Sequence, residues 1–322
     1  MQTEADPDGP LLSVILATDT VARVERVIQS LAAQTIAKRI ELILVLTARL
    51  DDSVREKLSR DFHSVEAIDV ETIVPLAVAR AKGVRRASAP FIFIAETHAY
   101  PDPTLAEKLI DALSGEWSLA VPGFRNSNPG SGLSWAGFLN DYGAWSENLE
   151  GGEIHRPPSH DAAFRRSVLL EFGDRLEKAL TFGDELYITL NARGQRSYFE
   201  PAARIQHVNI SRFSSFLRER YLSGVLIGGY RSERWSIPKR LAYAAGSPLI
   251  PIVLLARIRR GVRDAGRTHS LPATTIPALV LGAVLKAAGE ARGYLFGAPP
   301  SAEEGMTGFE VRKLAFNSGD ET

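Results

Sequence analysis

The alternation of buried strands and amphipathic helices in the first third of the chain constrains its fold most. Short apolar runs typical of buried strands occur at Leu11–Ala17, Ile40–Leu46 and Phe91–Ala95, with a shorter run at Val65–Val70. Segments with helical spacing of apolar residues separate them, the clearest being Val21–Leu31. Such alternation is typical of α/β proteins, so we predict a mostly parallel sheet flanked by helices.

The strand at Phe91–Ala95 runs directly into the polar residues Glu96-Thr97-His98. Glu96 and His98 are two residues apart, so both project to one side if the chain stays extended. Ligands of open α/β sheets bind outside the carboxyl ends of the strands. A carboxylate beside an imidazole suits a divalent cation such as Mn²⁺, which can hold a diphosphate. The ordinary alternative is a sheet edge that ends in polar residues.

The composition excludes several classes of protein. The 322 residues include 38 basic and 38 acidic ones, and this zero net charge argues against a general nucleic-acid binder. The absence of cysteine excludes disulfides, thiolate zinc sites and cysteine nucleophiles. Residues 1–10 are polar and acidic without the apolar core of a secretory signal. We therefore expect a disordered N-terminus followed by a cytosolic domain.

The residues after Phe124 have a different composition. Residues 126–156 mix Gly, Ser, Asn and Pro with aromatic residues, which predicts either a functional or mobile loop or an ordered cover with an aromatic cluster. Beyond it we predict helices over Phe164–Phe172 and Asp184–Arg193, the second ended by Gly194 in a left-handed C-cap. A strand is predicted over Arg196–Val208.

Five motifs, in order, resemble those of family 2 glycosyltransferases, which have the GT-A (Rossmann-like) fold. The motifs are Ser30–Thr35, Ala79–Gly83, Phe91–His98, Gly183–Gly194 and Pro201–His207. The resemblance implies inverting transfer of a hexose-like sugar from a nucleotide-diphospho-sugar to a glycan or lipid-linked acceptor, as in the synthesis of cell-envelope polysaccharides. It also implies a divalent cation, Mn²⁺ or Mg²⁺, as cofactor.

The chain departs from the family pattern in four places. Glu96-Thr97-His98 stands for the usual Asp-x-Asp, and Ala81 replaces an asparagine. The second strand ends in Leu46-Thr47-Ala48, without the acidic pair that usually meets the nucleobase. The usual base position falls at Gly183. These departures keep two alternatives open: a catalytically inactive member that binds sugar nucleotides, and a membrane-surface interaction protein.

The resemblance also assigns catalytic and metal-binding roles. Glu96, His98 and His207 become the metal ligands, although His207 could instead be an ordinary hydrogen-bonded histidine at a strand end. Asp184 becomes the general base, with Glu185 as the second choice. The alternative for Asp184 is a carboxylate that the dipole favours at the start of a helix.

Four further residues are expected to bind substrate: Thr18, Arg80, His160 and Asp161. Arg80 either contacts a phosphate or lies on a solvated helix face, and the second case is the commoner one for a basic helix. His160 and Asp161 either line the acceptor pocket or cap the helix that follows them.

Two apolar segments near the C-terminus, Leu241–Ala256 and Leu271–Leu285, are short for a membrane span, which needs about 20 residues. If both crossed, the arginines at 257–267 would lie outside, against the positive-inside rule. We therefore predict helices that lie in or dip into the cytosolic face of the cell membrane, with arginines on anionic headgroups. The alternatives are a soluble helical lid and segments that span the membrane.

These observations predict four parts of the chain. A disordered N-terminus (1–10) precedes a GT-A glycosyltransferase domain (11–235). A C-terminal apolar and basic helical region (236–297) associates with the membrane, and a loose tail (298–322) follows.

Overall fold

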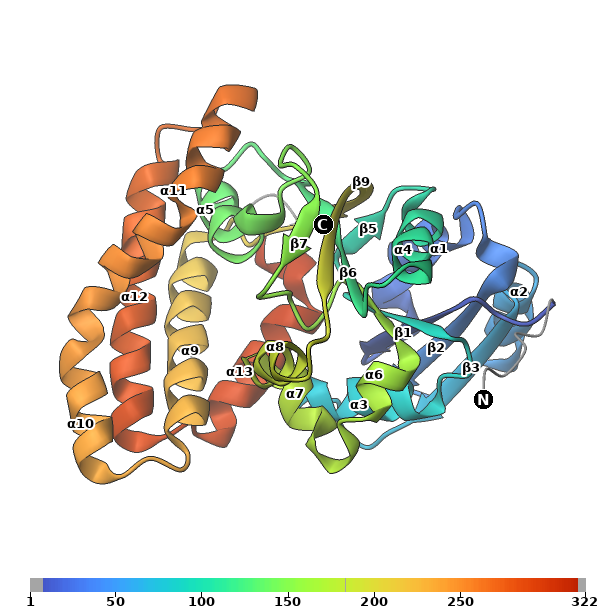
Figure 1. Cartoon of the computed structure of the whole chain (residues 1–322), viewed down its shortest axis with the longest axis horizontal. Helices are drawn as coiled ribbons and strands as arrows, with labels where there is room; N and C mark the ends of the chain where they lie inside the picture. The colour runs from blue at the N-terminus through green and yellow to red at the C-terminus, as the bar shows by residue number, and fades with distance from the viewer. Residues whose placement is uncertain (1–7, 183, 318–322) are drawn as a thin grey trace. The chain divides into compact units, whose positions relative to one another are not determined.

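A computed structural model describes residues 8–182 and 184–317 (Figure 1). The chain forms two compact units. The first contains the residues up to Gly123 together with Leu149–Gln206, and the second contains Phe124–Asn148 and the chain from His207 onwards. This division differs from the expected boundary at residue 235, because segments assigned to the glycosyltransferase domain pack with the C-terminal helices.

The first unit is built around a nine-stranded sheet in the order β3-β2-β1-β4-β8-β6-β9-β5, with β7 paired to β9. The strands β3, β2, β1 and β4 are parallel, whereas β8 is antiparallel to both β4 and β6. The α/β prediction is confirmed, with its parallel part in the first four strands. The strands are β1 (Leu12–Thr18), β2 (Ile40–Leu46), β3 (Ser64–Asp69), β4 (Phe91–Ala95), β5 (Ala99–Pro101), β6 (Leu119–Asn126), β7 (Gly152–Ile154), β8 (Ala162–Arg165) and β9 (Ser197–His207).

Helices cover both faces of this sheet because the apolar strands β1 and β2 are buried along their whole length. Figure 1 shows α1 and α4 on one side of the sheet and α3 and α6 on the other. The helices of this unit are α1 (Glu25–Ala32), α2 (Asp52–Ser59), α3 (Leu76–Arg86), α4 (Leu105–Ser114), α6 (Arg166–Leu170), α7 (Leu176–Phe182) and α8 (Asp184–Ala192), with short 3-10 turns η1 (Val21–Val24), η2 (Ala37–Arg39) and η4 (Gly173–Arg175).

Two details of the first unit test the sequence predictions. Gly194 has φ of 70° two residues after the last residue of α8, so the predicted left-handed cap is confirmed. The helix expected over Phe164–Phe172 is wrong at its start, because Ala162–Arg165 forms β8 and α6 begins only at Arg166. The small apolar residues Ala162 and Ala163 fit between β4 and β6, which compensates their weak preference for strands.

The segment expected as a loop or cover contains a buried helix of the second unit. Helix α5 (Gly132–Asp141) starts where the hydroxyl of Ser131 accepts a hydrogen bond from the Leu133 amide. Its aromatic side chains Trp135 and Phe138 are buried, and a 3-10 turn, η3 (Gly143–Trp145), follows. The interpretation as an ordered cover is therefore correct for this helix.

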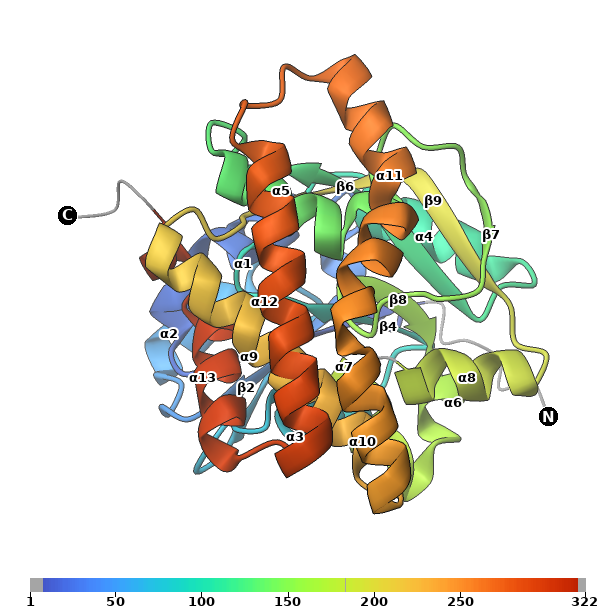
Figure 2. The same ribbon diagram turned by 90° about the vertical axis from the view of Figure 1, so that its left-hand side faces the viewer.

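The core of the second unit is a close contact between two long helices, α9 (Phe213–Ser232) and α12 (Thr275–Phe296). Glycines on both helices make it possible. A Cβ atom added at Gly228 would lie 2.4 Å from the Glu290 carbonyl oxygen, and one at Gly293 would lie 2.3 Å from the Val225 carbonyl oxygen. Figure 2 shows α12 between α9 and the helices α10 (Ile237–Gly246) and α11 (Ile250–Thr268), which the 3-10 turn η5 (Ser247–Leu249) joins.

The C-terminal end of the chain corrects one sequence prediction, and the N-terminal end is described only from residue 8. The expected loose tail instead contains α13 (Pro300–Val311), packed on α9, and the 3-10 turn η6 (Lys313–Phe316). The tail is folded because the side chains of Ala302 and Phe309 are buried. Of the N-terminus expected to be disordered, residues 1–7 lie outside the described residues. Gly9 is held, because its carbonyl oxygen accepts a hydrogen bond of 2.7 Å from Arg39 Nε.

Candidate metal and substrate site

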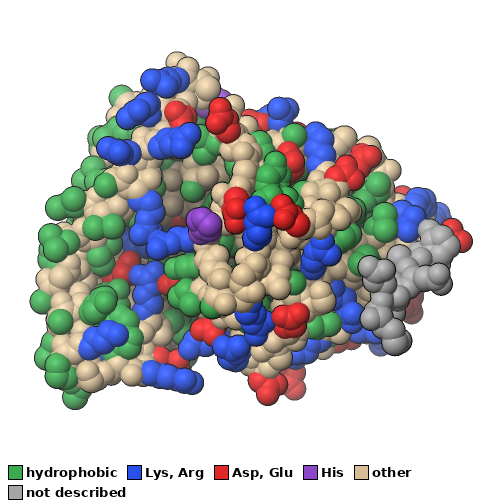
Figure 3. Space-filling view, in the orientation of Figure 1, with side chains coloured by type: hydrophobic (Ala, Val, Ile, Leu, Met, Phe, Trp, Pro, Cys, Tyr) green, Lys and Arg blue, Asp and Glu red, His purple; other side chains and the backbone are tan. Residues whose placement is uncertain are grey.

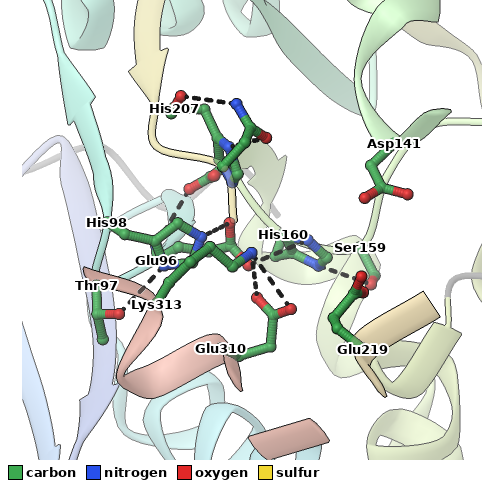
Figure 4. A network of polar contacts seen from close by, with 12 residues as sticks. Glu96, Thr97, His98, Asp141, Ser159, His160, His207, Glu219, Glu310 and Lys313 are labelled. Atoms are coloured by element: carbon green, nitrogen blue, oxygen red, sulfur yellow. Dashed lines mark hydrogen bonds and ion pairs between the residues drawn. The ribbon is translucent and has the colours of Figure 1, made fainter. Parts of the chain in front are cut away.

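The polar residues between β4 and β5 are buried at the carboxyl end of β4. Neither Glu96, Thr97 nor His98 is more than 5% exposed. One Glu96 oxygen lies 3.3 Å from His98 Nε2, and the other lies 3.3 Å from His160 Nε2 and 3.5 Å from Arg80 Nη2. Figure 4 shows the side chains of Glu96, His98 and His160 pointing toward one another. A buried carboxylate needs such compensating groups, since it has lost its hydration.

His207, the last residue of β9, completes a possible metal-binding group with Glu96 and His98. Each residue offers one ligand atom, and the three atoms lie within 4.8 Å of one another. His98 Nδ1 is 3.2 Å from the Thr97 hydroxyl, and His207 Nδ1 is 3.0 Å from Asn209 Oδ1. Such contacts orient the rings of metal-binding histidines. One carboxylate and two imidazoles fit a divalent cation and suit Mn²⁺ better than Mg²⁺, which prefers oxygen ligands.

Strand β8 brings His160 and Asp161 beside Glu96, because β8 pairs with β4. The Asp161 amide donates to the Ile94 carbonyl oxygen at 2.6 Å, and Asp161 Oδ1 accepts from the Glu96 amide at 3.1 Å. Asp161 has φ of 47°, a left-handed conformation that is uncommon for a residue other than glycine. The alternative in which these residues cap a helix is wrong, since the strand β8 follows them.

Burial, and next the nearby Glu96 carboxylate, raise the pKa of Asp161 well above its usual range. The Arg80 guanidinium acts in the opposite direction but is outweighed. A raised pKa favours the neutral carboxyl form, because a second negative charge would be buried next to Glu96. Glu96 is therefore the carboxylate better suited to a cation here.

Arg80 does not lie on a solvated helix face. Its side chain on α3 is 7% exposed and lies against Glu96, so the more common alternative for a basic helix is contradicted. Thr18 is buried at the end of β1, where its hydroxyl lies 3.3 Å from the Thr20 carbonyl oxygen. Both residues lie at the carboxyl ends of the strands or beside them, and their substrate contacts stay predictions.

The predicted base residues lie in the first turn of α8. Asp184 and Glu185 are both half-buried, and Glu185 Oε1 is 3.2 Å from Arg175 Nη1. Gly183, the position of the base in the resembling motif, lies outside the described residues. Asp184 can therefore still be the general base or a carboxylate that is favoured by the dipole at the start of a helix.

Sequence reasoning missed Asn209, which contacts His207. Its side-chain amide also donates to Asn126 Oδ1 at 3.0 Å, and Asn126 in turn accepts from the Ser134 hydroxyl. The spacing His207-Val208-Asn209 was the available signal, because residues two apart on an extended chain share a side. The partner Asn126 is far away in the sequence and gives no such signal.

The sequence model for glycosyl transferase family 2 matches residues 13–173, half of the chain. A search of curated proteins found no match. Among solved structures, a crystal structure of S. aureus TarS 1–349 in complex with UDP is similar at 14% identity and a TM-score of 0.47, with 88% of this chain and 90% of that chain covered. A second structure of S. aureus TarS has 15% identity and a TM-score of 0.47, with 88% and 55% covered. The family match includes Glu96 and His98 and ends before Asp184 and His207.

Proposed function

The chain belongs to glycosyl transferase family 2 and has a GT-A-like fold, and we propose that it is an inverting, metal-assisted sugar transferase with a nucleotide-diphospho-sugar donor. The observation that carries this proposal is the buried group of Glu96, His98 and His207 after β4. Donors bind outside the carboxyl ends of strands in such sheets. A leaving nucleoside diphosphate must be stabilised by positive charge at that place. Glu96, His98 and His207 can supply this charge by holding a divalent cation.

Glu96, His98 and His207 would hold the divalent cation, Mn²⁺ or Mg²⁺. When bound, it supplies Lewis-acid stabilisation of the negative charge on the leaving diphosphate. Arg80 holds the Glu96 carboxylate in place and carries a fixed positive charge close to this metal-binding residue. Asp161 holds the backbone of Glu96 by accepting its amide hydrogen.

Asp184 is the proposed general base, with Glu185 as second choice. An inverting transfer needs a group that takes the proton of the acceptor hydroxyl while that oxygen attacks the sugar. We keep Thr18, His160 and Asp161 as substrate-binding residues, the last two on the acceptor side.

The base assignment predicts separate effects on binding and turnover. Asp184→Asn should retain donor affinity and lose transfer by roughly 10²–10⁴-fold, because only proton abstraction is removed. The exposed Asp174→Asn is the matched control and should leave both quantities unchanged. An equal loss of donor binding and turnover in Asp184→Asn would place the base elsewhere.

We propose that the acceptor is a glycan or a lipid-linked precursor of the cell envelope, used at the cytosolic face of the cell membrane. Among residues 8–182 and 184–317, one helical run, Ile237–Thr268, is long and apolar enough to cross a membrane by length and composition. A transferase that uses lipid-linked acceptors gains from a position where they are concentrated.

Calorimetry with a panel of sugar nucleotides, with and without Mn²⁺, tests the function. We expect one sugar nucleotide to bind in the presence of Mn²⁺ and to be turned over with a suitable acceptor. Binding without turnover would favour an inactive sugar-nucleotide-binding member, which the departures at Ala48 and Ala81 keep open. If no nucleotide binds, the chain is instead a membrane-surface interaction protein.

A further inference from the structure

One side of the C-terminal helices α10, α11 and α12 exposes apolar side chains over its whole length. Only 6% of the most apolar stretch of the run Ile237–Thr268 is buried. On α12, Ile276, Val280 and Val284 are four residues apart, so they share one face of the helix. Figure 3 shows hydrophobic side chains along the edge formed by α10 and α12. The exposed apolar residues of these helices include Ile237, Leu241, Leu249, Ile252, Val253, Ile276, Val280, Leu281 and Val284.

These side chains are not needed for the core of the second unit. The opposite side of α12 is closed by α9, where the backbones approach through glycines. Large contiguous apolar surfaces are rare on soluble monomers and mark a binding surface. We call the surface formed by these nine residues the apolar face.

The second half of α11 carries basic side chains next to the apolar face. Five arginines and a single aspartate lie between Ile250 and Thr268, and all five arginines are exposed. Arg260 Nε lies 3.9 Å from Asp264 Oδ2, and the Arg260 side chain is 78% exposed. The arginines are Arg257, Arg259, Arg260, Arg263 and Arg267.

Aromatic side chains border the same face near the start of α10. The half-buried Trp235 and the exposed Tyr243 have ring centres 4.4 Å apart, and both pack on the buried Tyr294, whose ring centre is 5.7 Å from each. Lys239 Nζ is 4.2 Å from the Trp235 ring centre. Tryptophan and tyrosine beside lysine are enriched at the level of lipid headgroups.

The helical run lies along the folded unit rather than away from it. Both α10 and α11 contact α12, and at Gly261 an added Cβ atom would lie 2.8 Å from the Gly143 carbonyl oxygen. A helix that packs on a folded unit at both ends cannot cross a bilayer without leaving that unit. The run can therefore bind a surface that lies parallel to the helix axes.

We propose that the apolar face is a docking surface for an anionic lipid bilayer. The helices α10–α12 lie in the plane of the membrane, with the apolar side chains inserted and the α11 arginines on phosphate headgroups. A second copy of the chain fits less well. A symmetric pair would place the arginines against one another or against Lys239 and Arg240, so like charges would meet.

The test is sedimentation of the full chain with vesicles of phosphatidylcholine, alone or mixed equally with phosphatidylglycerol, with no donor or acceptor present. The chain should sediment with the anionic vesicles, and high salt should release only part of it. Ile252→Asp with Val253→Asp should abolish binding. Arg259→Gln with Arg263→Gln should weaken binding to anionic vesicles about 30-fold and leave the weak binding to neutral ones unchanged.

Matched controls are Ile188→Asp and Arg60→Gln, both exposed and both in the first unit. They should bind vesicles like the natural chain. Melting curves on every variant detect misfolding. Donor calorimetry on every variant tests the proposed transferase function separately from vesicle docking. The proposal is overturned if the folded chain stays in the supernatant with anionic vesicles. It is also overturned if the aspartate pair abolishes concentration-dependent self-association while vesicle binding is unchanged.

Discussion

The surroundings of Glu96 and the apolar face of α10–α12 depart from ordinary burial in opposite directions. Around Glu96, ionisable side chains are buried at the end of β4 and compensate one another. On α10–α12, large apolar side chains are exposed to solvent. Each arrangement costs free energy in the isolated chain unless something is bound. Buried charge and exposed apolar surface on one chain therefore indicate two different ligands, a cation with its diphosphate and a lipid surface.

The two regions are also supported differently. Hydrogen bonds from neighbouring strands and loops fix the side chains around Glu96, as Asp161 and Thr97 show. Backbone contact through glycines fixes the helices behind the apolar face. Substitutions should therefore affect activity in the first region and stability in the second.

Among the changes that compare these two regions, Glu96→Gln has the largest expected effect. The amide keeps the shape of the side chain but removes the charge, so we expect transfer to fall by about 10²–10³-fold. Arg80 loses its anionic partner, so activity must be expressed per folded molecule, with the folded fraction taken from melting curves. Glu56→Gln, on an exposed pair with Arg60, is the control and should have normal activity. Equal activity of Glu96→Gln and Glu56→Gln would contradict a role for the Glu96 charge in the transfer.

The next effect is a loss of stability in Gly228→Ala. The new methyl group would meet the Glu290 carbonyl oxygen at 2.4 Å, so the helices must separate. We expect the free energy of unfolding to fall by about 1–3 kcal/mol. Gly246→Ala is the matched control on α10, since an added Cβ atom there has no neighbour within 4 Å. It should stabilise the chain by about 0.5–1 kcal/mol. Urea unfolding of both variants measures the difference, and similar curves would contradict close packing of α9 on α12.

The smallest effect concerns the ion pair between Asp141 and Arg220. Burial raises the pKa of Asp141, but the Arg220 guanidinium outweighs it and holds the pKa well below the usual range. Two hydrogen bonds of 2.9 and 2.6 Å join the groups, and Glu219 also accepts from Arg220. Because the Asp141 side chain is 36% exposed, we expect Asp141→Asn to cost only about 1 kcal/mol at pH 7.

This cost should depend on pH in one direction. A lowered pKa in the folded state gives stability that is present above the unfolded pKa, about 3.9. That stability is lost as the pH falls through the folded pKa. The difference in unfolding free energy between the natural chain and Asp141→Asn should therefore be constant from pH 5 to 7 and shrink below about pH 4. A difference that grows on acidification would contradict the sign of this pKa shift.

The sequence predicted the parallel half of the sheet because β1, β2 and β4 are continuous apolar runs. It failed for β8, whose alanines become a strand only between β4 and β6. The tail was also missed, since the burial of Phe309 on α13 depends on partners in three dimensions. At the site, the spacing of Glu96 and His98 gave a direct signal. The proximity of His160 and the burial of Arg80 could not be predicted, because both depend on contacts made across the fold.

The most direct test of the central claim is electron spin-echo spectroscopy of Mn²⁺ added to the full chain. We expect a single bound Mn²⁺ ion coupled to nitrogen nuclei of two histidines, His98 and His207. His207→Ala should remove one of the two couplings and weaken Mn²⁺ binding, whereas the exposed His63→Ala should have no effect. The claim that this group holds the cation would be contradicted by Mn²⁺ that binds without nitrogen coupling, or by the same couplings in His207→Ala.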